Sequence, residues 1–389
     1  MTVSLAVVAS HPVQYYAPLF RELARRVDLT VYYGHRASQS DQAKAGFGVG
    51  FEWDVDLLSG YHHEFLDNVA KLPELGRFEG VDTPEIGHKL RSGRFDAVLV
   101  LGWYLKCFLQ TLWAAKRLGI PVLVRGDSHL ETPRSPLKRL AKQALYPIFL
   151  RQFDAALIVG ARNRAYWHRY GYPQSRMFAS PHCVDTTWFA SRGTAGAATE
   201  LRQRLGISQN APVALFAGKL VDFKRPGDLI VAAADARRKG VAVEVLIAGS
   251  GPLEVDLRAL AARHDVPLHM LGFCNQSQMP AAYAASDVLI LPSNGRETWG
   301  LVVNEALACG TPVILSDAVG CAQDFAGKGG AARTFRMGDT AGCSEVLCET
   351  LAHPPRDEVI NKINQEYSIE AAVAGIIQAA QSVAPTSRK

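Results

Sequence analysis

The sequence predicts an α/β protein built from two doubly wound, parallel sheets. Apolar runs of strand length alternate with amphipathic helical stretches along the whole chain. This order places parallel strands side by side, with helices covering both faces of each sheet. The chain has 389 residues, enough for two such domains with a core each. A composition of 48% apolar and 20% charged residues is typical of a globular protein.

Five strands are expected in each half of the chain. They are bounded by Gly, Pro and polar residues and separated by helical stretches such as 16–26 and 104–119. Residues 186–212, rich in Ala, Gly, Ser and Thr, should form the junction. The expected domains are therefore 1–190 and 191–368, with a final helical segment at 369–389. The ten expected strands are 3–9, 29–33, 95–102, 120–126, 154–160, 211–218, 241–249, 266–272, 287–293 and 311–317.

Composition excludes several classes of protein. No stretch approaches the roughly 20 apolar residues that span a bilayer, and the first residues lack the charged start of a secretory signal, so a cytoplasmic protein is expected. Nucleic acid is not favoured as a partner, because the excess of basic residues is small and the sequence contains no recognised nucleic-acid-binding module. The cysteines lack metal-ligand spacing, which indicates reduced thiols and no structural zinc: Cys107, Cys183, Cys274, Cys309, Cys321, Cys343 and Cys348.

Two carboxylates, Glu297 and Glu305, flank the expected start of a buried helix at Gly300 and Leu301. A helix opened by glycine presents backbone N–H groups that suit a phosphate. Carboxylates suit the hydroxyl groups of a ribose or a hexose, because they accept hydrogen bonds. The combination indicates a nucleotide-sugar site. The alternative is one capping glutamate and one solvated helix glutamate.

Upstream residues favour the nucleotide-sugar interpretation. Lys219 and Lys224 flank an expected strand-to-helix loop, where two ammonium groups neutralise a diphosphate. Gly249 and Gly251 then lie between a strand and a helix, and Phe273 follows the next strand.

This ordered series resembles the nucleotide-binding half of retaining GT-B glycosyltransferases of family 4. The likeness is close over residues 213–325 and includes two glutamates separated by seven residues. Residues 181–189 are also similar to a family segment, although His182 and Cys183 replace its usual Asn and Gly. The resemblance implies two Rossmann-like domains facing a central cleft, with the last helix crossing back to the first domain.

The resemblance also implies roles for residues of the second domain. Lys219, Lys224 and the N–H groups of Gly300 and Leu301 would hold the diphosphate, without a metal ion. Glu305 would bind ribose hydroxyls, and Glu297 would lie against the hexose. The loops at Gly251 and at Phe273 and Cys274 would contact the nucleotide largely through backbone atoms. The co-substrate would be a UDP- or GDP-linked sugar, with no other cofactor.

In the first domain, Asp127 and His129 follow the expected strand 120–126. Related enzymes keep a histidine or an aspartate there, facing the sugar that is transferred. The alternative is a loop histidine paired with Asp127 or Glu131 for structural reasons. Many family members also have a Gly-Gly pair in the loop at 10–20; this chain has Gln14 and Tyr15 instead, so no contact of that loop is carried over.

Residues 134–153 form an expected helix that is both basic and apolar. Residues 1–190 carry 23 Lys and Arg against 17 Asp and Glu, which fits an acidic or membrane-borne acceptor. A basic amphipathic helix can attach a protein to an anionic bilayer from the cytoplasmic side. The alternative is a helix whose basic face is only solvated. The cationic side chains concerned are Arg134, Lys138, Arg139 and Lys142.

The function that these expectations support is a retaining, metal-independent glycosyltransferase. It would move a hexose from a nucleoside diphosphate sugar to a hydroxyl of a glycan, a lipid-linked saccharide or a small molecule, in polysaccharide, lipopolysaccharide or glycolipid assembly. The alternative is a nucleotide-sugar 2-epimerase, which binds the same kind of ligand on the same architecture.

Overall fold

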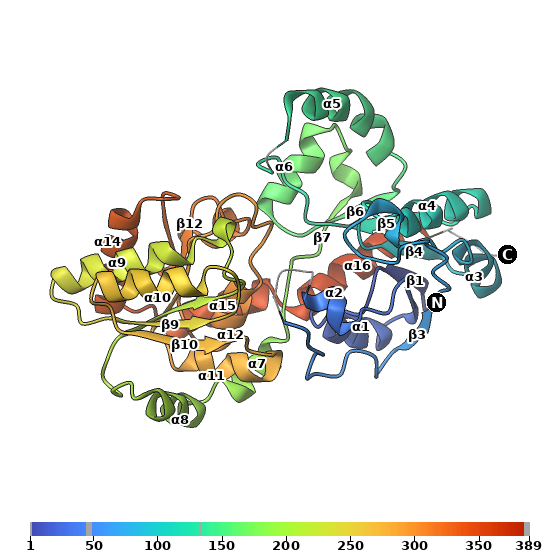
Figure 1. Cartoon of the computed structure of the whole chain (residues 1–389). Coiled ribbons are helices and arrows are strands. Elements are labelled where there is room, and N and C mark those ends of the chain that lie inside the picture. Colours follow the sequence, from blue (N-terminus) through green and yellow to red (C-terminus); the bar gives the residue numbers. More distant parts are fainter. Residues whose placement is uncertain (1, 44–48, 133, 385–389) are drawn as a thin grey trace. The chain divides into compact units, whose positions relative to one another are not determined.

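The computed structural model describes residues 2–43, 49–132 and 134–384, and the chain divides into two compact units (Figure 1). The first unit comprises residues 1–41, 56–182 and 369–389, and the second comprises 42–55 and 183–368. The division therefore falls a few residues before the boundary expected at 190. Residues 42–55, which the sequence assigns to the first domain, group with the second unit.

A seven-stranded parallel sheet forms the centre of the first unit, in the order β3-β2-β1-β4-β5-β6-β7. The strand order changes direction between β1 and β4, and ligands of open α/β sheets bind beyond the carboxyl ends of strands at such a point. The strands are β1 (Ser4–Ala9), β2 (Asp28–Tyr33), β3 (His62–Phe65), β4 (Ala97–Val100), β5 (Val122–Arg125), β6 (Ala155–Ile158) and β7 (Met177–Ala179).

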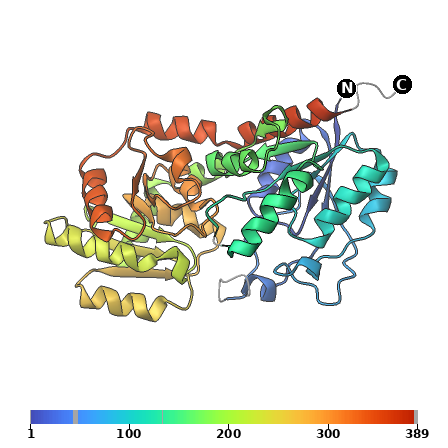
Figure 2. The same ribbon diagram turned by 90° about the horizontal axis from the view of Figure 1, so that it is seen from above.

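Helices cover the first sheet, and the closing helix α16 (Ile369–Val383; Figure 2, red) belongs to this unit, where it packs against α1, β6 and β7. At the closest approach of α16 to β7, a Cβ on Gly375 would lie 1.7 Å from the carbonyl oxygen of Ala179. Residues 385–389 lie outside the described residues. The other helical elements of this part are α1 (Tyr16–Ala24), α2 (Gln39–Gln42), η2 (Phe78–Gly80), α3 (Ile86–Gly93), α4 (Lys106–Leu118), α5 (Pro136–Leu150), α6 (Ala161–Arg169) and η3 (Gln174–Arg176).

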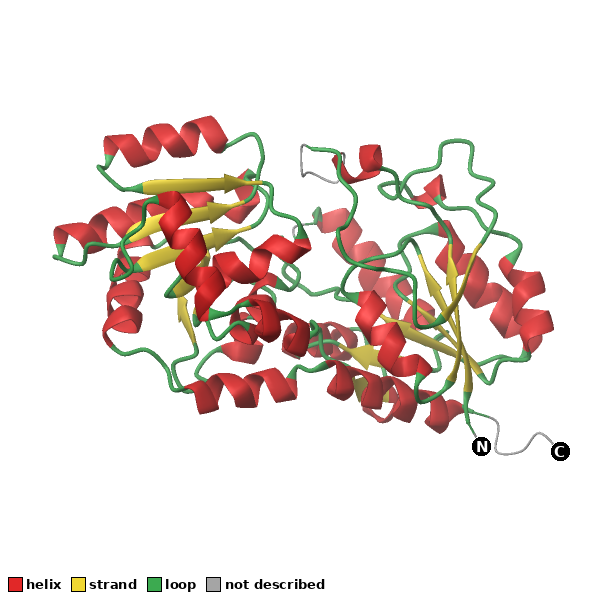
Figure 3. Cartoon of the chain, turned by 90° about the horizontal axis from the view of Figure 1, so that it is seen from below, coloured by secondary structure: helices red, strands yellow, loops and turns green. Residues whose placement is uncertain are grey.

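A six-stranded parallel sheet forms the centre of the second unit, in the order β10-β9-β8-β11-β12-β13. Its switch point lies between β8 and β11. The strands, drawn in yellow in Figure 3, are β8 (Val213–Ala217), β9 (Glu244–Ala248), β10 (Leu268–Gly272), β11 (Val288–Leu291), β12 (Val313–Ser316) and β13 (Ala332–Phe335).

Helices flank the second sheet on both faces. In Figure 1, α9 and α10 lie above the strands β9 and β10 and α11 lies below them; α9 and α14 pack on each other, and α12 contacts β11 and β12. The helical elements are α7 (Thr186–Arg192), α8 (Ala195–Leu205), η4 (Asp222–Lys224), α9 (Pro226–Arg238), α10 (Glu254–Arg263), η5 (Gln276–Gln278), α11 (Met279–Ala284), α12 (Val302–Ala308), α13 (Ala322–Phe325), α14 (Thr340–Ala352) and α15 (Asp357–Glu366).

The predicted fold class is confirmed: both sheets are parallel and carry helices. The central strands β4, β5, β6, β11 and β12 are buried along their whole length, as strands covered on both faces must be. Three strands that the sequence did not reveal, β3, β7 and β13, all lie at sheet edges. Among the described residues, none of the helices combines the length and the apolar character needed to cross a membrane.

Candidate active site

The switch point of the second unit brings together charged residues from two loops. Lys224 ends η4, in the loop after β8, and Glu297 lies in the loop after β11. Their side chains form an ion pair, and each is 13% exposed. Ser293 also donates a hydrogen bond to Glu297, at 3.3 Å. The sequence analysis assigns these two residues to different groups of the ligand, the diphosphate and the hexose, whereas in the structure they pair with each other.

Lys219 belongs to the same charge cluster. Burial lowers the pKa of Lys219, the nearby ammonium of Lys224 lowers it further, and Glu297 acts in the opposite direction. Two cations and one carboxylate leave a net positive charge at the carboxyl end of β8, next to the switch point. Such a site attracts a diphosphate, because buried charges interact in a medium of low effective dielectric.

Glycines allow the loops after β8 and β9 to touch. A Cβ on Gly251 would lie 2.6 Å from the carbonyl oxygen of Leu220, and one on Gly249 would lie 1.9 Å from that of Gly218. The backbone amide of Leu220 donates to Ser250 O at 2.9 Å, which joins the two loops. Gly251 therefore has a structural reason to be glycine, in addition to its expected place beside the nucleotide.

Helix α12 follows Gly300, which has a φ of +98° and so adopts a conformation that favours glycine. Leu301 is the N-cap and makes no side-chain capping bond, and the first-turn amide of Val303 donates to Gly300 O at 2.9 Å. The helix has seven residues, which is about two turns, so only a few peptide groups contribute to its dipole. Binding of a phosphate by the Gly300 and Leu301 amides stays a prediction.

Glu305 is buried on α12, at 5% exposure, and accepts a hydrogen bond of 2.5 Å from the hydroxyl of Tyr283. Tyr283 lies on α11, and its carbonyl accepts a hydrogen bond from the Thr311 side chain. The tyrosine thus fixes the orientation of the carboxylate expected to bind ribose. Sequence reasoning missed Tyr283, because nothing in the local pattern links it to a residue on a different helix.

Phe273 and Cys274 lie in the loop after β10, and the segment 49–55 contacts this loop. The rings of Phe51 and Phe273 are 4.3 Å apart. Asn275 donates to Glu52 O at 2.7 Å, so polar and aromatic contacts both tie the segment to the loop. Burial raises the pKa of Cys274 to about 11, which keeps its thiol protonated at neutral pH. Sequence reasoning did not anticipate this contact.

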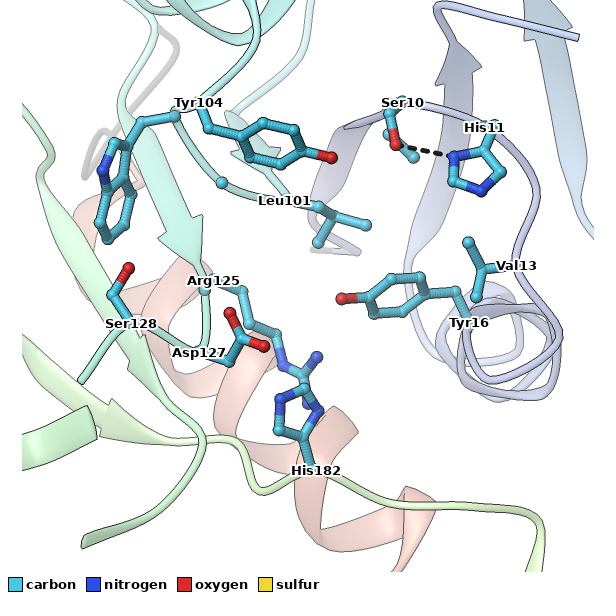
Figure 4. A pocket seen from close by; sticks show the side chains of 14 residues that line it. Ser10, His11, Val13, Tyr16, Leu101, Tyr104, Arg125, Asp127, Ser128 and His182 are labelled. Atoms are coloured by element: carbon cyan, nitrogen blue, oxygen red, sulfur yellow. Dashed lines mark hydrogen bonds between the residues drawn. The ribbon is translucent and has the colours of Figure 1, made fainter. Parts of the chain in front are cut away.

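A pocket of about 250 Å³ lies in the first unit at the switch point between β1 and β4 (Figure 4). It is formed by residues that follow the carboxyl ends of β1, β4 and β5, together with one residue after β7. The side chains that carry polar groups or aromatic rings are Ser10, His11, Tyr16, Trp103, Tyr104, Arg125, Asp127, Ser128 and His182.

Asp127 lines this pocket, but His129 does not. His129 is 1% exposed, and neither of its ring nitrogens has a hydrogen-bond partner within the described part of the chain. Burial lowers its pKa. In this structure His129 is therefore enclosed, and the imidazoles that line the pocket are those of His11 and His182. The sequence had singled out His182 only as a departure from the family pattern.

The loop after β1 enters this pocket through His11 and Tyr16. Ser10 Oγ and His11 Nδ1 are 2.9 Å apart (Figure 4). Burial and the neighbouring His35 lower the pKa of His11 to about 4, although Asp41 opposes the shift. Gln14, one of the two residues at the place of the family's glycines, is buried at 8% exposure. The pocket contact comes from Tyr16 and not from Tyr15.

All seven cysteines are free thiols. Within residues 2–43, 49–132 and 134–384, no group of three or more His, Cys, Asp or Glu side chains is arranged to hold a metal ion.

Comparison with known proteins relates this chain to sugar transferases. Residues 197–365 match the family described as glycosyl transferases group 1. The D-inositol 3-phosphate glycosyltransferase of Thermomonospora curvata is 32% identical over 78% of this chain and 73% of its own length. The corresponding protein of Xylanimonas cellulosilytica is 32% identical over 61% of this chain, and the alignment spans 63% of that relative.

Solved structures show the same fold. A glycosyltransferase from Rickettsia africae has a TM-score of 0.75 at 12% identity, over 99% of this chain and all of the other. HepE of Anabaena, solved with UDP, has a TM-score of 0.73 at 15% identity, over 98% of this chain and 100% of the other. The chain belongs to the family of group 1 glycosyl transferases.

Proposed function

We propose that this protein is a retaining glycosyltransferase that moves a hexose from a nucleoside diphosphate sugar to a hydroxyl acceptor. The observation that carries the proposal is the cluster of Lys219, Lys224 and Glu297 at the switch point of the second unit. It combines cations for a diphosphate with a carboxylate for a sugar, in the half of the chain that matches the family. The relatives named above are transferases, so the epimerase is not proposed.

In this proposal the Lys224–Glu297 ion pair is the resting state of the donor site. A diphosphate offers Lys224 two negative charges in place of one, so the ammonium turns to the phosphates and stabilises the leaving group. Glu297 is then available to the hexose, where its charge favours the positive charge that develops at the ring. The two lysines supply the positive charge that a divalent cation would otherwise provide.

Glu305 has the other proposed role in the donor site, which is to accept hydrogen bonds from the ribose hydroxyls. The bond from Tyr283 occupies Oε2 and orients the carboxylate. A carboxylate has room for further donors, because its two oxygens offer about four lone-pair positions. The nucleotide is UDP or GDP, and the product enters a polysaccharide, a lipopolysaccharide or a glycolipid.

Thermal unfolding with added nucleoside diphosphates tests this function. UDP or GDP should raise the melting temperature, because a ligand that binds only the folded state stabilises it by mass action. The shift should persist in EDTA, since the proposed site uses lysines. Lys219→Ala should reduce the shift, whereas Lys239→Ala, at an exposed lysine paired with Asp235 at the end of α9, should not. If neither UDP nor GDP changes the melting temperature, the proposed function is wrong.

A further inference from the structure

Residues 51–54, here called the strap, lie on the loop between β10 and α11 of the second unit. The strap belongs to residues 42–55, which group with the second unit although the chain before and after them belongs to the first. Within the strap, Phe51 is buried and Trp53 is partly buried, whereas the two acidic residues are exposed. This alternation is that of an extended segment with one face packed against a surface.

Aromatic rings form one part of the contact between the strap and the loop. The ring centres of Phe51 and Phe273 are 4.3 Å apart, and the two ring planes are tilted by 39°. Trp53 packs edge-on against Phe51, at 4.8 Å and 89°. An edge-on contact is favourable, because the edge of an aromatic ring carries positive charge and the face carries negative charge. Phe51 thus joins the strap to Phe273.

Hydrogen bonds form the other part of this contact. The amide of Ser277 donates to the Asp54 carboxylate at 3.2 Å, and the Ser277 hydroxyl donates to the same group. Asn275 donates from its side chain to Glu52 O at 2.7 Å. The side-chain oxygen of Asn275 also caps the turn η5 by accepting from the Gln276 amide. Asn275 therefore binds the strap and shapes the loop at the same time.

The loop between β10 and α11 adjoins the proposed donor site at both of its ends. Before the loop, the amide of Gly249, which follows β9, donates to Gly272 O at 2.8 Å, so the loops after β9 and β10 lie side by side. After the loop comes α11, where Tyr283 donates to Glu305, the carboxylate proposed to bind the ribose. The base of a nucleotide is attached to its ribose, so a ribose at Glu305 places the base within reach of the loop.

We propose that Phe51 is a positioning residue for the nucleotide: it acts through Phe273 and holds the loop between β10 and α11 in the shape that receives the base. The proposal rests on the glycosyltransferase function above, and it adds a residue that lies outside the region 197–365 matched by the family. The strap contacts the loop after β10, whereas Lys219 and Lys224 lie between β8 and α9. The strap should therefore act on the base and not on the diphosphate.

Isothermal titration calorimetry of the full chain tests the proposal with UDP, GDP and inorganic pyrophosphate, which shares the diphosphate but lacks the base. Phe51→Ala should weaken binding of the tighter nucleotide by about tenfold, a difference near 1.4 kcal/mol, and change pyrophosphate affinity by less than about twofold. A general loss of folding would weaken the binding of both kinds of ligand alike. Phe51→Tyr keeps the aromatic ring and should retain most of the nucleotide affinity.

Phe78→Ala is the matched control, at a phenylalanine of η2 in the first unit that is 49% exposed. It should bind all three ligands as the wild type does. Equal losses of nucleotide and pyrophosphate affinity in Phe51→Ala, or an unchanged affinity for both, would overturn the proposal.

Hydrogen exchange of the wild-type chain supplies a measurement that needs no variant. Coupling between two equilibria is reciprocal, so a nucleotide whose binding is favoured by the strap must also stabilise the strap. UDP or GDP should slow exchange at the amides of residues 51–54 more than pyrophosphate does at equal occupancy. The same exchange rates with both kinds of ligand would also overturn the proposal. Failure of the wild type to bind UDP or GDP is a different result and counts against the proposed function itself.

Discussion

The Lys224–Glu297 pair shows that two residues of a ligand-binding motif can also interact with each other, so that each affects the role of the other. Each side chain is 13% exposed, so both charges are largely withdrawn from water and depend on each other. Removing one partner of such a pair leaves the other uncompensated. A substitution at Lys224 therefore acts in two ways, by losing a cation and by exposing a diphosphate to the charge of Glu297.

Lys224→Ala should weaken binding of the nucleoside diphosphate by roughly 1.5 to 3 kcal/mol, the scale of a charge-assisted hydrogen bond. Isothermal titration calorimetry measures the effect, with Lys239→Ala as the control. The double variant Lys224→Ala, Glu297→Gln should recover part of the loss, because the repelling carboxylate is gone. An affinity equal to that of the wild type in Lys224→Ala would remove this lysine from the donor site.

Removing the charge of Glu297 and removing that of Glu305 should change different kinetic constants. Glu297→Gln should lower kcat by about 10²-fold without weakening nucleotide binding, because the lost charge acts on the transition state and Lys224 is released for the phosphates. Glu305→Gln should mainly raise KM for the donor, through weaker contact with the ribose. Steady-state kinetics with varied donor separates the two. The same kinetic signature in both variants would contradict the assignment.

His11 should make stability depend on pH. Its pKa in the folded chain is about 4 and its ordinary value is 6.5. Between these values the unfolded chain binds a proton that the folded chain does not, so the contribution is complete above pH 6.5 and is lost as the pH falls towards 4. The loss is on the order of 3 kcal/mol for a shift of this size.

Thermal unfolding from pH 7 to pH 5 measures this dependence. Replacing His11 by Asn removes the titrating group and keeps a donor near Ser10, so the decline in melting temperature should become shallower. His88→Asn, at an exposed residue of α3, is the control and should keep the wild-type decline. Equal declines in wild type and His11→Asn would show that the imidazole does not titrate in this way.

Among the elements, α5 differs most from a simple amphipathic helix. Leu150 is buried and Tyr146 and Phe149 pack against the core, as expected of an inner face. The outer face is also apolar, with exposures between 64% and 77% for Leu137, Leu140, Leu145 and Ile148. The spacing of these residues places them along one side of the helix. Figure 1 shows α5 at the edge of the first unit beside α6.

Lys142 does not belong to the solvent-facing basic residues of this helix, because its side chain contacts two tyrosines. It donates to the hydroxyl of Tyr166 at 3.2 Å and lies 4.1 Å from the ring centre of Tyr146. Burial, and then the charge of Arg134, lower its pKa to about 8. The cations left to meet an anionic surface are Arg134, Lys138 and Arg139, which flank the exposed leucines near the start of the helix.

The apolar outer face leads us to expect that α5 attaches the protein to anionic membranes. Sedimentation with anionic liposomes should be strong at low salt and weak at high salt, since surface attraction is screened beyond about 8 Å at physiological ionic strength. Changing Leu137, Leu140 and Ile148 to Ser should reduce it, as should reversing Arg134, Lys138 and Arg139. Val255→Ser, at an exposed valine of α10, is the control. Sedimentation unaffected by both multiple variants would make α5 a solvated helix.

Most of the strands that the sequence reveals are largely buried, whereas those it hides are partly exposed or very short; β10 is the exception, because it is a partly exposed edge strand that its apolar residues still reveal. The central strands are continuous apolar runs because helices cover both of their faces. β3 reads His62-His63-Glu64-Phe65, with no fully buried side chain, and it lies at an edge, where one neighbour and partial exposure allow polar residues. β7 is three residues long and β13 has two partly exposed positions. These three edge strands depend on pairing with a neighbour, which local hydrophobicity does not show.

At the scale of the whole molecule, the sequence could predict those residues of the candidate sites whose place follows from the strand directly before them. Lys219 and Lys224 follow the apolar strand β8 of the second sheet, and Asp127 follows β5 of the first. Within each sheet, the parallel strands bring the residues after their carboxyl ends to the same edge. Tyr283 beside Glu305 and the segment 49–55 beside Phe273 were not predictable, because they come from other parts of the chain and meet these residues only through tertiary packing. His129 does not line the pocket of the first unit, because whether a loop side chain points inward depends on its neighbours, and its contact with the transferred sugar stays a prediction.

The stereochemistry of the reaction tests the proposed retaining mechanism. We expect the product to keep the anomeric configuration of the donor, with departure of the diphosphate and attack of the acceptor on the same face of the sugar. This expectation rests on the resemblance to retaining GT-B glycosyltransferases of family 4, which implies that lysines stabilise the leaving group and that Glu297 lies against the hexose. An inverting enzyme would instead need a general base aligned with the acceptor on the opposite face of the ring.

Proton NMR of the glycoside product distinguishes the two outcomes through the coupling constant at the new anomeric centre, whose configuration is fixed once the glycosidic bond has formed. The same assay with EDTA should give the same configuration at a similar rate, because no step of the proposed chemistry passes through a divalent cation. Loss of activity in EDTA that magnesium restores would contradict the lysine-based donor site. An inverted centre would falsify the retaining assignment and, with it, the role given to Glu297, while leaving nucleotide binding by Lys219 and Lys224 open to its own test.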